Sequence, residues 1–138
     1  MPDTNPTSES LVNAGNRTIG SAGFEVGPFS YGLWRFTTPD VREAQALIET
    51  ALGAGMNLID TADVYGFDWG GTGFGTVEAL LGKVLEQAPA LRDQMVLATK
   101  GGIAPPIPYD SSPVALRAAC EASLRRLGVD VIDLYQVH

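Results

Sequence analysis

The chain has 138 residues, enough for one domain with a substantial core, and 45% hydrophobic against 18% charged residues is the composition of an ordinary globular protein. Its formal charge of −7, with no cluster of basic residues to meet phosphates, argues against nucleic acid or a membrane surface as a partner. One cysteine and one histidine exclude an internal disulfide and argue against a metal site such as structural zinc.

The N-terminal segment, residues 1–15, is polar and rich in Pro, Ser, Thr and Asn, so we expect a disordered leader there. It lacks the apolar core of a signal peptide. No apolar run in the chain approaches the ~20 residues that a transmembrane helix needs. These features predict a cytoplasmic protein.

The first predicted elements are a hairpin and a strand. Residues 17–20 and 24–26 are short strand-like runs, and Ser21-Ala22-Gly23 between them is a turn sequence. After Gly27-Pro28 we expect a first strand near residues 29–35.

A unit of turn, helix, turn and strand then recurs. Thr38-Pro39-Asp40 opens the first helix, where Pro39 suits the first helical position and Asp40 has capping-box spacing to Glu43. Apolar residues recur at helical spacing, and Gly55 is a natural stop. By the same reasoning, a second helix runs over 76–87, a third lies between Ser112-Pro113 and Gly128, and further strands lie at 57–60, 95–99 and 131–137.

The third helix is expected to bury Leu116, Cys120 and Leu124. We interpret Cys120 as a half-buried core thiol, because no histidine or second cysteine is near it in the sequence to activate it.

The spacing of the strands indicates an α/β fold. Their centres are roughly 26 to 39 residues apart, as in βα units, and they are apolar on consecutive positions, as in parallel strands buried on both faces. A doubly wound sheet should carry a glycine fingerprint after its first strand, and none is present. A whole (β/α)8 TIM barrel needs about 250 residues. We therefore expect residues 16–138 to form the first half of such a barrel, with the hairpin, strands one to four and helices one to three.

Four residues able to move or stabilise a proton follow the strands. Asp60, Lys100 and His138 come directly after strands two, three and four, and Tyr65 lies five residues beyond Asp60. In a barrel such positions converge on the C-terminal face. A tyrosine phenol has a pKa near ~10, and a neighbouring ammonium held by a carboxylate lowers the pKa of such a phenol. A tyrosine in this setting can protonate a carbonyl oxygen, and a neutral imidazole can orient that carbonyl.

These residues in this order strongly resemble the aldo-keto reductase superfamily. The resemblance covers about residues 16–138 and rests on motifs that are specific in order and spacing. The matching stretches are Arg17-Thr18-Ile19-Gly20, Gly32-Leu33-Trp34, Asp60-Thr61-Ala62 through Tyr65-Gly66, Glu78-Ala79-Leu80-Leu81-Gly82, Ala98-Thr99-Lys100, Ser123-Leu124 with Leu127-Gly128, and Asp133-Leu134-Tyr135-Gln136-Val137-His138.

The resemblance implies a role for each site residue. Tyr65 is then the general acid, Asp60 and Lys100 tune it, and His138 positions a small carbonyl substrate. The family uses NADPH, and the resemblance places the nicotinamide against Gly32, Leu33, Trp34 and Asp60. It also implies that Trp34, Tyr65 and His138 contact the substrate.

Two departures from the family pattern stand out. The family has only a few residues between Tyr-Gly and the following helix, whereas residues 67–75 here form a longer glycine-rich loop that we expect in the wall of the substrate pocket. Its aromatic residues Trp69 and Phe74 either line the substrate or pack against their own loop. The family residues after strands seven and eight, which bind the adenosine 2′-phosphate and the pyrophosphate, have no counterpart in this sequence.

The leading hypothesis is therefore an NADPH-dependent reduction of an aldehyde or ketone to an alcohol by the complete protein. The alternatives are a cofactor-sensing subunit of a larger assembly with the same fold, and a fragment without activity. Four parallel strands would also leave two apolar edges, at residues 29–35 and 131–137, through which we expect self-association.

Overall fold

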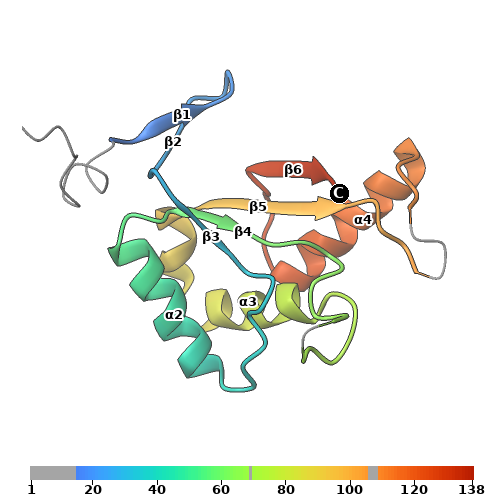
Figure 1. The fold of residues 1–138 in the computed structure, drawn as a ribbon, viewed down its shortest axis with the longest axis horizontal. Helices are drawn as coiled ribbons and strands as arrows, with labels where there is room; N and C mark the ends of the chain where they lie inside the picture. Colours follow the sequence, from blue (N-terminus) through green and yellow to red (C-terminus); the bar gives the residue numbers. More distant parts are fainter. Residues whose placement is uncertain (1–14, 69, 106–108) are drawn as a thin grey trace, which may run out of the picture.

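The computed structural model describes residues 15–68, 70–105 and 109–138 (Figure 1). Apart from Gly15, the leader expected over residues 1–15 lies outside this part of the chain. Within the described ranges, no helix is long and apolar enough to span a membrane.

The described chain begins with the predicted hairpin. Strands β1 (Arg17–Ile19) and β2 (Phe24–Val26) pair in antiparallel register. Asn57 fastens the hairpin to the main sheet, because its side-chain amide donates to the carbonyl of Glu25 at 2.9 Å and accepts from the N–H of Gly27 at 2.8 Å.

The main sheet has four parallel strands, which confirms the α/β class expected from the sequence. In spatial order they are β3 (Ser30–Gly32), β4 (Leu58–Asp60), β5 (Val96–Gly101) and β6 (Leu134–Val137). The spatial order is also the order along the chain, so each crossover adds one strand to the same side of the sheet. Among the described residues, β3 and β6 are therefore its two edges.

Both edge strands are shorter than predicted, and a hydrogen bond accounts for each difference. The chain turns directly after β3, where the carbonyl of Leu33 accepts from the N–H of Phe36 at 3.0 Å. Ahead of β6, a carboxylate oxygen of Asp133 accepts from the N–H of Leu97 at 2.7 Å. A side chain thus replaces a backbone carbonyl in the ladder, and regular strand geometry begins only at Leu134.

Three α-helices connect the strands, namely α2 (Val41–Gly53), α3 (Thr76–Gln87) and α4 (Pro113–Leu127). Figure 1 shows α2 and α3 on one side of the sheet, where α3 packs against α2 and α4, and α4 packs against β5. A short 3-10 helix, η1 (Pro89–Gln94), fills the connection to β5 and was not predicted from the sequence.

The start of α2 differs from the prediction, and its end agrees with it. Asp40 is the N-cap and accepts from the N–H of Arg42 at 2.8 Å, so Pro39 precedes the helix instead of opening it. Glu43 accepts from the hydroxyl of Thr38 at 2.6 Å, so no capping box forms. At the other end, Gly55 has a φ of +81°, a left-handed conformation that closes the helix as expected.

The core lies between the helices and the sheet and is built mainly from aliphatic side chains. Its largest fully buried apolar members are Leu33, Ile48, Ile59, Leu81, Leu97 and Leu127. The prediction for α4 was wrong in part: its buried residues are Ser123 and Leu127, while Leu116 and Leu124 are half-buried. Cys120 is a half-buried free thiol, as interpreted from the sequence. The small side chain of Ala119 approaches β5 instead, 3.1 Å from where a Cβ on Gly101 would lie.

Candidate active site

The parallel sheet brings all four predicted proton-handling residues to one end. Asp60 is the last residue of β4, Lys100 is the penultimate residue of β5, and His138 directly follows β6. Tyr65 lies in the loop after β4. The carboxyl ends of parallel strands meet at one edge, which is where sites form in folds of this class.

The Lys100 ammonium is the centre of this cluster. Its Nζ lies 2.8 Å from Asp60 Oδ2, 2.8 Å from the carbonyl of Thr61 and 3.2 Å from Tyr65 Oη. These contacts match the three donors of an ammonium. The lysine and aspartate side chains are only 14% and 27% exposed, so the ion pair is shielded from solvent. The cation therefore lies directly beside the tyrosine hydroxyl.

His138 completes the cluster beside Tyr65. The two rings meet edge to face at a centroid distance of 6.0 Å. The His138 N–H donates to the carbonyl of Gly101 at 2.8 Å, which fixes the backbone. Burial, followed by the Lys100 charge, lowers the pKa of His138 below its usual 6.5 although Asp60 acts in the opposite direction. The imidazole is therefore neutral at neutral pH, and within the described chain its buried Nδ1 has no hydrogen-bond partner.

A cavity of about 570 Å³ opens in front of these residues. Tyr65 and His138 line it, and so does Trp34, which is 48% exposed. The long loop after Tyr65 contributes Phe67 and Asp68. Other lining residues are Val64, Gly66, Ile103 and Pro105.

The long loop folds back on itself through three of its glycines. Gly66 has a φ of +96° and its carbonyl accepts from the N–H of Gly73 at 2.9 Å. A Cβ on Gly71 would lie 2.1 Å from the Gly66 carbonyl oxygen, so a side chain there would break this contact. Phe74 points to α4 instead of the cavity, where the guanidinium of Arg126 lies 5.7 Å from its ring centroid. Trp69, the other aromatic residue considered for the pocket, lies outside the described residues.

The segment expected to line a nicotinamide is only partly at the site. Gly32, at the end of β3, is exposed and lies beside Asp60 in the sheet register. No atom lies within 4 Å of the position of a Cβ on Gly32, so the space above it is open. Leu33 is fully buried in the core, and only its backbone faces this end, with its N–H donating to the Asp60 carbonyl at 2.9 Å.

Two residues of the site region were not singled out from the sequence. Gln136 donates from Nε2 to Asp60 Oδ1 at 3.1 Å. Glu78 is fully buried on α3, where it accepts from the Thr99 hydroxyl at 2.6 Å and pairs with Arg126 Nε at 2.7 Å. Glu78 thus connects α3 to β5 at Thr99, the residue before Lys100. Both residues belong to motifs that matched the reductase pattern, which was the available signal.

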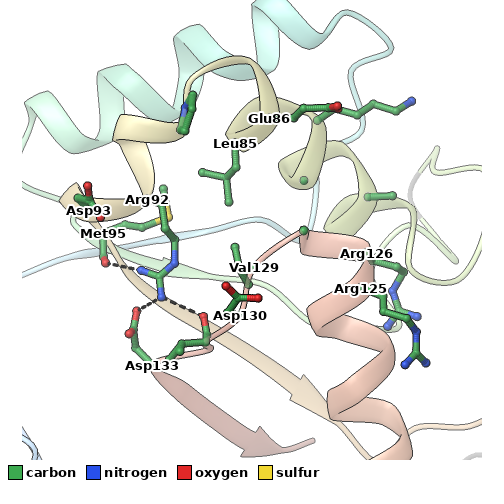
Figure 2. Close-up of a pocket in the computed structure, with 16 residues that line it drawn as sticks. Leu85, Glu86, Arg92, Asp93, Met95, Arg125, Arg126, Val129, Asp130 and Asp133 are labelled. Atoms are coloured by element: carbon green, nitrogen blue, oxygen red, sulfur yellow. Dashed lines mark hydrogen bonds and ion pairs between the residues drawn. The ribbon is translucent and has the colours of Figure 1, made fainter.

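A larger groove of about 1190 Å³ lies at the opposite end of the sheet, where the strands begin. Figure 2 shows the Arg92 guanidinium directed at the Asp133 carboxylate. It lies 2.9 Å from that carboxylate, 3.0 Å from the carbonyl of Val131 and 3.2 Å from that of Met95. This network ties η1 to the segments before β5 and β6, and none of the predicted site residues lies in the groove. In the described part of the chain, no three His, Cys, Asp or Glu side chains are grouped so that they could hold a metal ion.

Comparison with known proteins agrees with this geometry. The Aldo/keto reductase family profile matches residues 28–138. A 6-dehydroglucose reductase from Novosphingobium aromaticivorans is 55% identical over 126 residues, which are 88% of this chain and 40% of that protein. A 6-dehydroglucose reductase from Agrobacterium fabrum is 37% identical over 128 residues, 83% of this chain and 40% of that protein.

Solved structures give the same result. An aldo-keto reductase from Bacillus halodurans, in its holo form, superposes with a TM-score of 0.72 at 31% identity, over 90% of this chain and 40% of that chain. The fold thus matches part of a (β/α)8 barrel, and the chain spans 40% of the length of each of these three proteins. The profile match over most of its length shows that the chain belongs to the aldo/keto reductase family.

Proposed function

We propose that this protein, at its full natural length, reduces an aldehyde or ketone to an alcohol, with Tyr65 as the proton donor. The observation that carries the proposal is the Lys100 ammonium, held by Asp60 and lying 3.2 Å from Tyr65 Oη at the wall of a cavity. A cation so placed stabilises the phenolate that remains after the proton has left.

The residues present fit a nicotinamide cofactor. Members of the family typically depend on NAD(P)H. A flat ring needs an open approach to the site, and the exposed Gly32 with free space above it, next to the half-exposed Trp34, offers one. We propose NADPH, held on its nicotinamide side by Gly32, Trp34, Asp60 and the backbone of Leu33. When bound, NADPH would supply the hydride.

The chain's own residues then provide the proton and the orientation. Tyr65 Oη donates its proton to the carbonyl oxygen, so that the C=O group, having gained a hydride at carbon, becomes CH–OH. The neutral imidazole of His138 hydrogen-bonds the carbonyl and holds it toward the phenol. The Lys100 cation, held in place by Asp60, stabilises the phenolate until it is reprotonated.

We propose a sugar aldehyde as the substrate class. Two relatives that match over more than four fifths of this chain are 6-dehydroglucose reductases. The cavity supports this choice, because Trp34 and Phe67 present aromatic rings to it, and Asp68 contributes a carboxylate that can accept hydrogen bonds from hydroxyl groups.

The test replaces the tyrosine hydroxyl alone. In the full-length protein, Tyr65→Phe should lower kcat for 6-dehydroglucose by on the order of 10² or more, as expected for a general acid, while the Kd of NADPH stays unchanged. Tyr109→Phe, which removes a hydroxyl from an exposed tyrosine that is not among the described lining residues of the cavity, is the matched control and should leave kcat unchanged. A Tyr65→Phe variant with normal turnover would exclude the assignment of Tyr65 as the general acid.

A wild type that binds NADPH tightly but turns over no carbonyl would support the cofactor-sensing alternative instead.

A further inference from the structure

We propose that Gln136 is a positioning residue that fixes the Asp60 carboxylate and, through it, the Lys100 ammonium. This inference rests on the proposed function. The two oxygens of Asp60 have different donors: Lys100 Nζ holds Oδ2 at 2.8 Å, and Gln136 Nε2 holds Oδ1 at 3.1 Å. Asp60 therefore accepts one charged and one neutral hydrogen bond.

The sheet register explains why Gln136 reaches this carboxylate. In the parallel pairing of β5 with β6, Gln136 lies opposite Lys100. Side chains alternate between the two faces of a strand, so Lys100 and Gln136 point to the same face. The neighbouring Tyr135 points to the helical side, where its hydroxyl donates to the carbonyl of Leu116 on α4. Leu134 and Gln136 are thus the positions of β6 on the face of Asp60, and of these two only Gln136 has a side-chain donor.

Two donors hold a carboxylate in a way that one cannot. The terminal torsion of an aspartate is broad, so a carboxylate held at one oxygen can swing about that contact. A second donor on the other oxygen fixes the carboxylate plane. Asp60 orients the Lys100 ammonium, and this ammonium also contacts Tyr65 Oη. A carboxylate that is free to swing would therefore displace the ammonium from the proton donor.

The chemistry of an amide suits this role. Glutamine supplies an N–H without a charge, so it does not compete with Lys100 for the carboxylate as a second cation would. Gln136 also lies outside the described lining of the substrate cavity. Its removal should therefore change the chemical step and leave substrate binding alone.

The experiment measures kcat and KM for 6-dehydroglucose in the full-length protein with Gln136→Met, which keeps the length of the side chain but removes the donor. We expect kcat to fall by about tenfold, the effect of one hydrogen bond to a charged group, with KM unchanged. Gln87→Met, at an exposed glutamine on α3, is the control and should match the wild type.

A second variant gives a readout that a purely structural role would not move. Gln136→Glu has the same shape, but its ionised carboxylate repels Asp60, whereas its protonated form can donate to Oδ1. Its kcat relative to wild type should therefore rise as the pH falls, while the ratio for Gln136→Met stays flat. A pH-independent ratio for Gln136→Glu, or wild-type kcat in Gln136→Met, would overturn the proposal.

A double-mutant cycle shows whether Gln136 acts through Asp60. In an Asp60→Asn background, Gln136→Met should cause no further loss of kcat, and an undiminished loss would overturn the proposal. Wild-type turnover is measured in the same series, and a folded wild type that reduces no carbonyl would overturn the proposed function instead. The same four proteins can also be compared by chemical unfolding, which does not depend on turnover. If Gln136 contacts Asp60, the effects of the two substitutions on the free energy of unfolding are not additive, and additive effects would show that the two side chains do not interact.

Discussion

Lys100 connects the charged and proton-bearing groups at the carboxyl end of the sheet. Its ammonium contacts Asp60, the Thr61 carbonyl and the Tyr65 hydroxyl at the same time. Lys100→Met removes the cation beside the phenol and keeps an extended side chain. We expect kcat to fall and the pH dependence of kcat to shift, because the charge that favours the phenolate is gone. Steady-state rates across the pH range measure both effects.

The chain offers a matched control for this variant. Lys83 is the only other lysine and is exposed on α3, away from the cavity. Lys83→Met should leave both kcat and its pH profile as in the wild type. If Lys100→Met lowered the rate without moving the profile, Lys100 would be a structural residue that does not act on the reaction through its charge.

Asp63 gives a prediction about stability. It is 2% exposed, and among the described residues its Oδ1 has no hydrogen-bond partner. Burial, and then the negative charge of Glu78, raise its pKa from 3.8 to about 6, while Arg126 and the N–H of Val64 act in the opposite direction. The folded state therefore binds a proton that the unfolded state releases between these pH values. Its contribution to stability is full below pH 3.8 and is lost as the pH rises through about 6.

Asp63→Asn removes this titration. At pH 8 the variant should be more stable than the wild type by roughly 2 kcal/mol, and the advantage should disappear near pH 4. Urea unfolding of the full-length protein at several pH values measures the difference. Asp93→Asn, at an exposed carboxylate on η1, serves as the control. A constant difference between Asp63→Asn and wild type from pH 4 to pH 8 would contradict the prediction.

The sequence predicted the meeting of Asp60, Tyr65, Lys100 and His138 because a simple geometric rule brings residues after parallel strands to one edge. It did not predict the contact between Gln136 and Asp60. That contact depends on the register of β6 against β5, which decides the face on which each residue lies. The burial of Glu78 was not predicted either, because a glutamate in a helix is ordinarily exposed and becomes buried only when partners such as Thr99 and Arg126 surround it.

At the level of elements, α3 and α4 pack closely because a glycine lies where they meet. A Cβ on Gly82 would lie 2.2 Å from the Arg126 carbonyl oxygen, and backbone cannot move aside cheaply. Gly82→Ala should therefore destabilise the fold by about 1–3 kcal/mol, the usual cost of overpacking.

Gly53 on α2 is the matched control for that change. It too is a helical glycine, but no atom lies within 4 Å of its Cβ position. Gly53→Ala should stabilise the protein by about 0.5 kcal/mol through higher helix propensity. Urea unfolding should therefore show a lower free energy of unfolding for Gly82→Ala and a higher one for Gly53→Ala. A loss of stability in both variants, or in neither, would show that the close approach of α3 to α4 is not what requires Gly82.

Helix bounds were easier to predict than strand bounds, for a physical reason. Ser112 and Gly128 cap α4 as expected, since a hydroxyl acceptor and a left-handed glycine act within one turn of chain. The start of β6, in contrast, depends on a distant partner, because the Asp133 side chain bonds Leu97 of β5. The helix η1 has only six residues and so no apolar periodicity to detect.

At the scale of the whole molecule, the described sheet has two unpaired edges. Phe29 beside β3 is 59% exposed, and Val137 on β6 is 62% exposed. Unpaired backbone flanked by apolar side chains favours pairing with another chain. We therefore expect the isolated 138-residue chain to self-associate as its concentration rises, which sedimentation velocity would detect. Val137→Lys should weaken the association, because a charge on an edge strand opposes pairing. A monomer at every concentration would contradict this expectation.

Carbonyl reduction at this site is tested most directly by following the transferred hydrogen. The full-length protein would be incubated with 6-dehydroglucose and NADPH that carries deuterium at the reactive carbon of its nicotinamide, and the product analysed by mass spectrometry. We expect glucose with one deuterium at the former aldehyde carbon, formed by the wild type and on the order of 10²-fold more slowly by Tyr65→Phe. A folded, cofactor-bound wild type that leaves the deuterium on the nicotinamide and the aldehyde unreduced would contradict the proposed reduction.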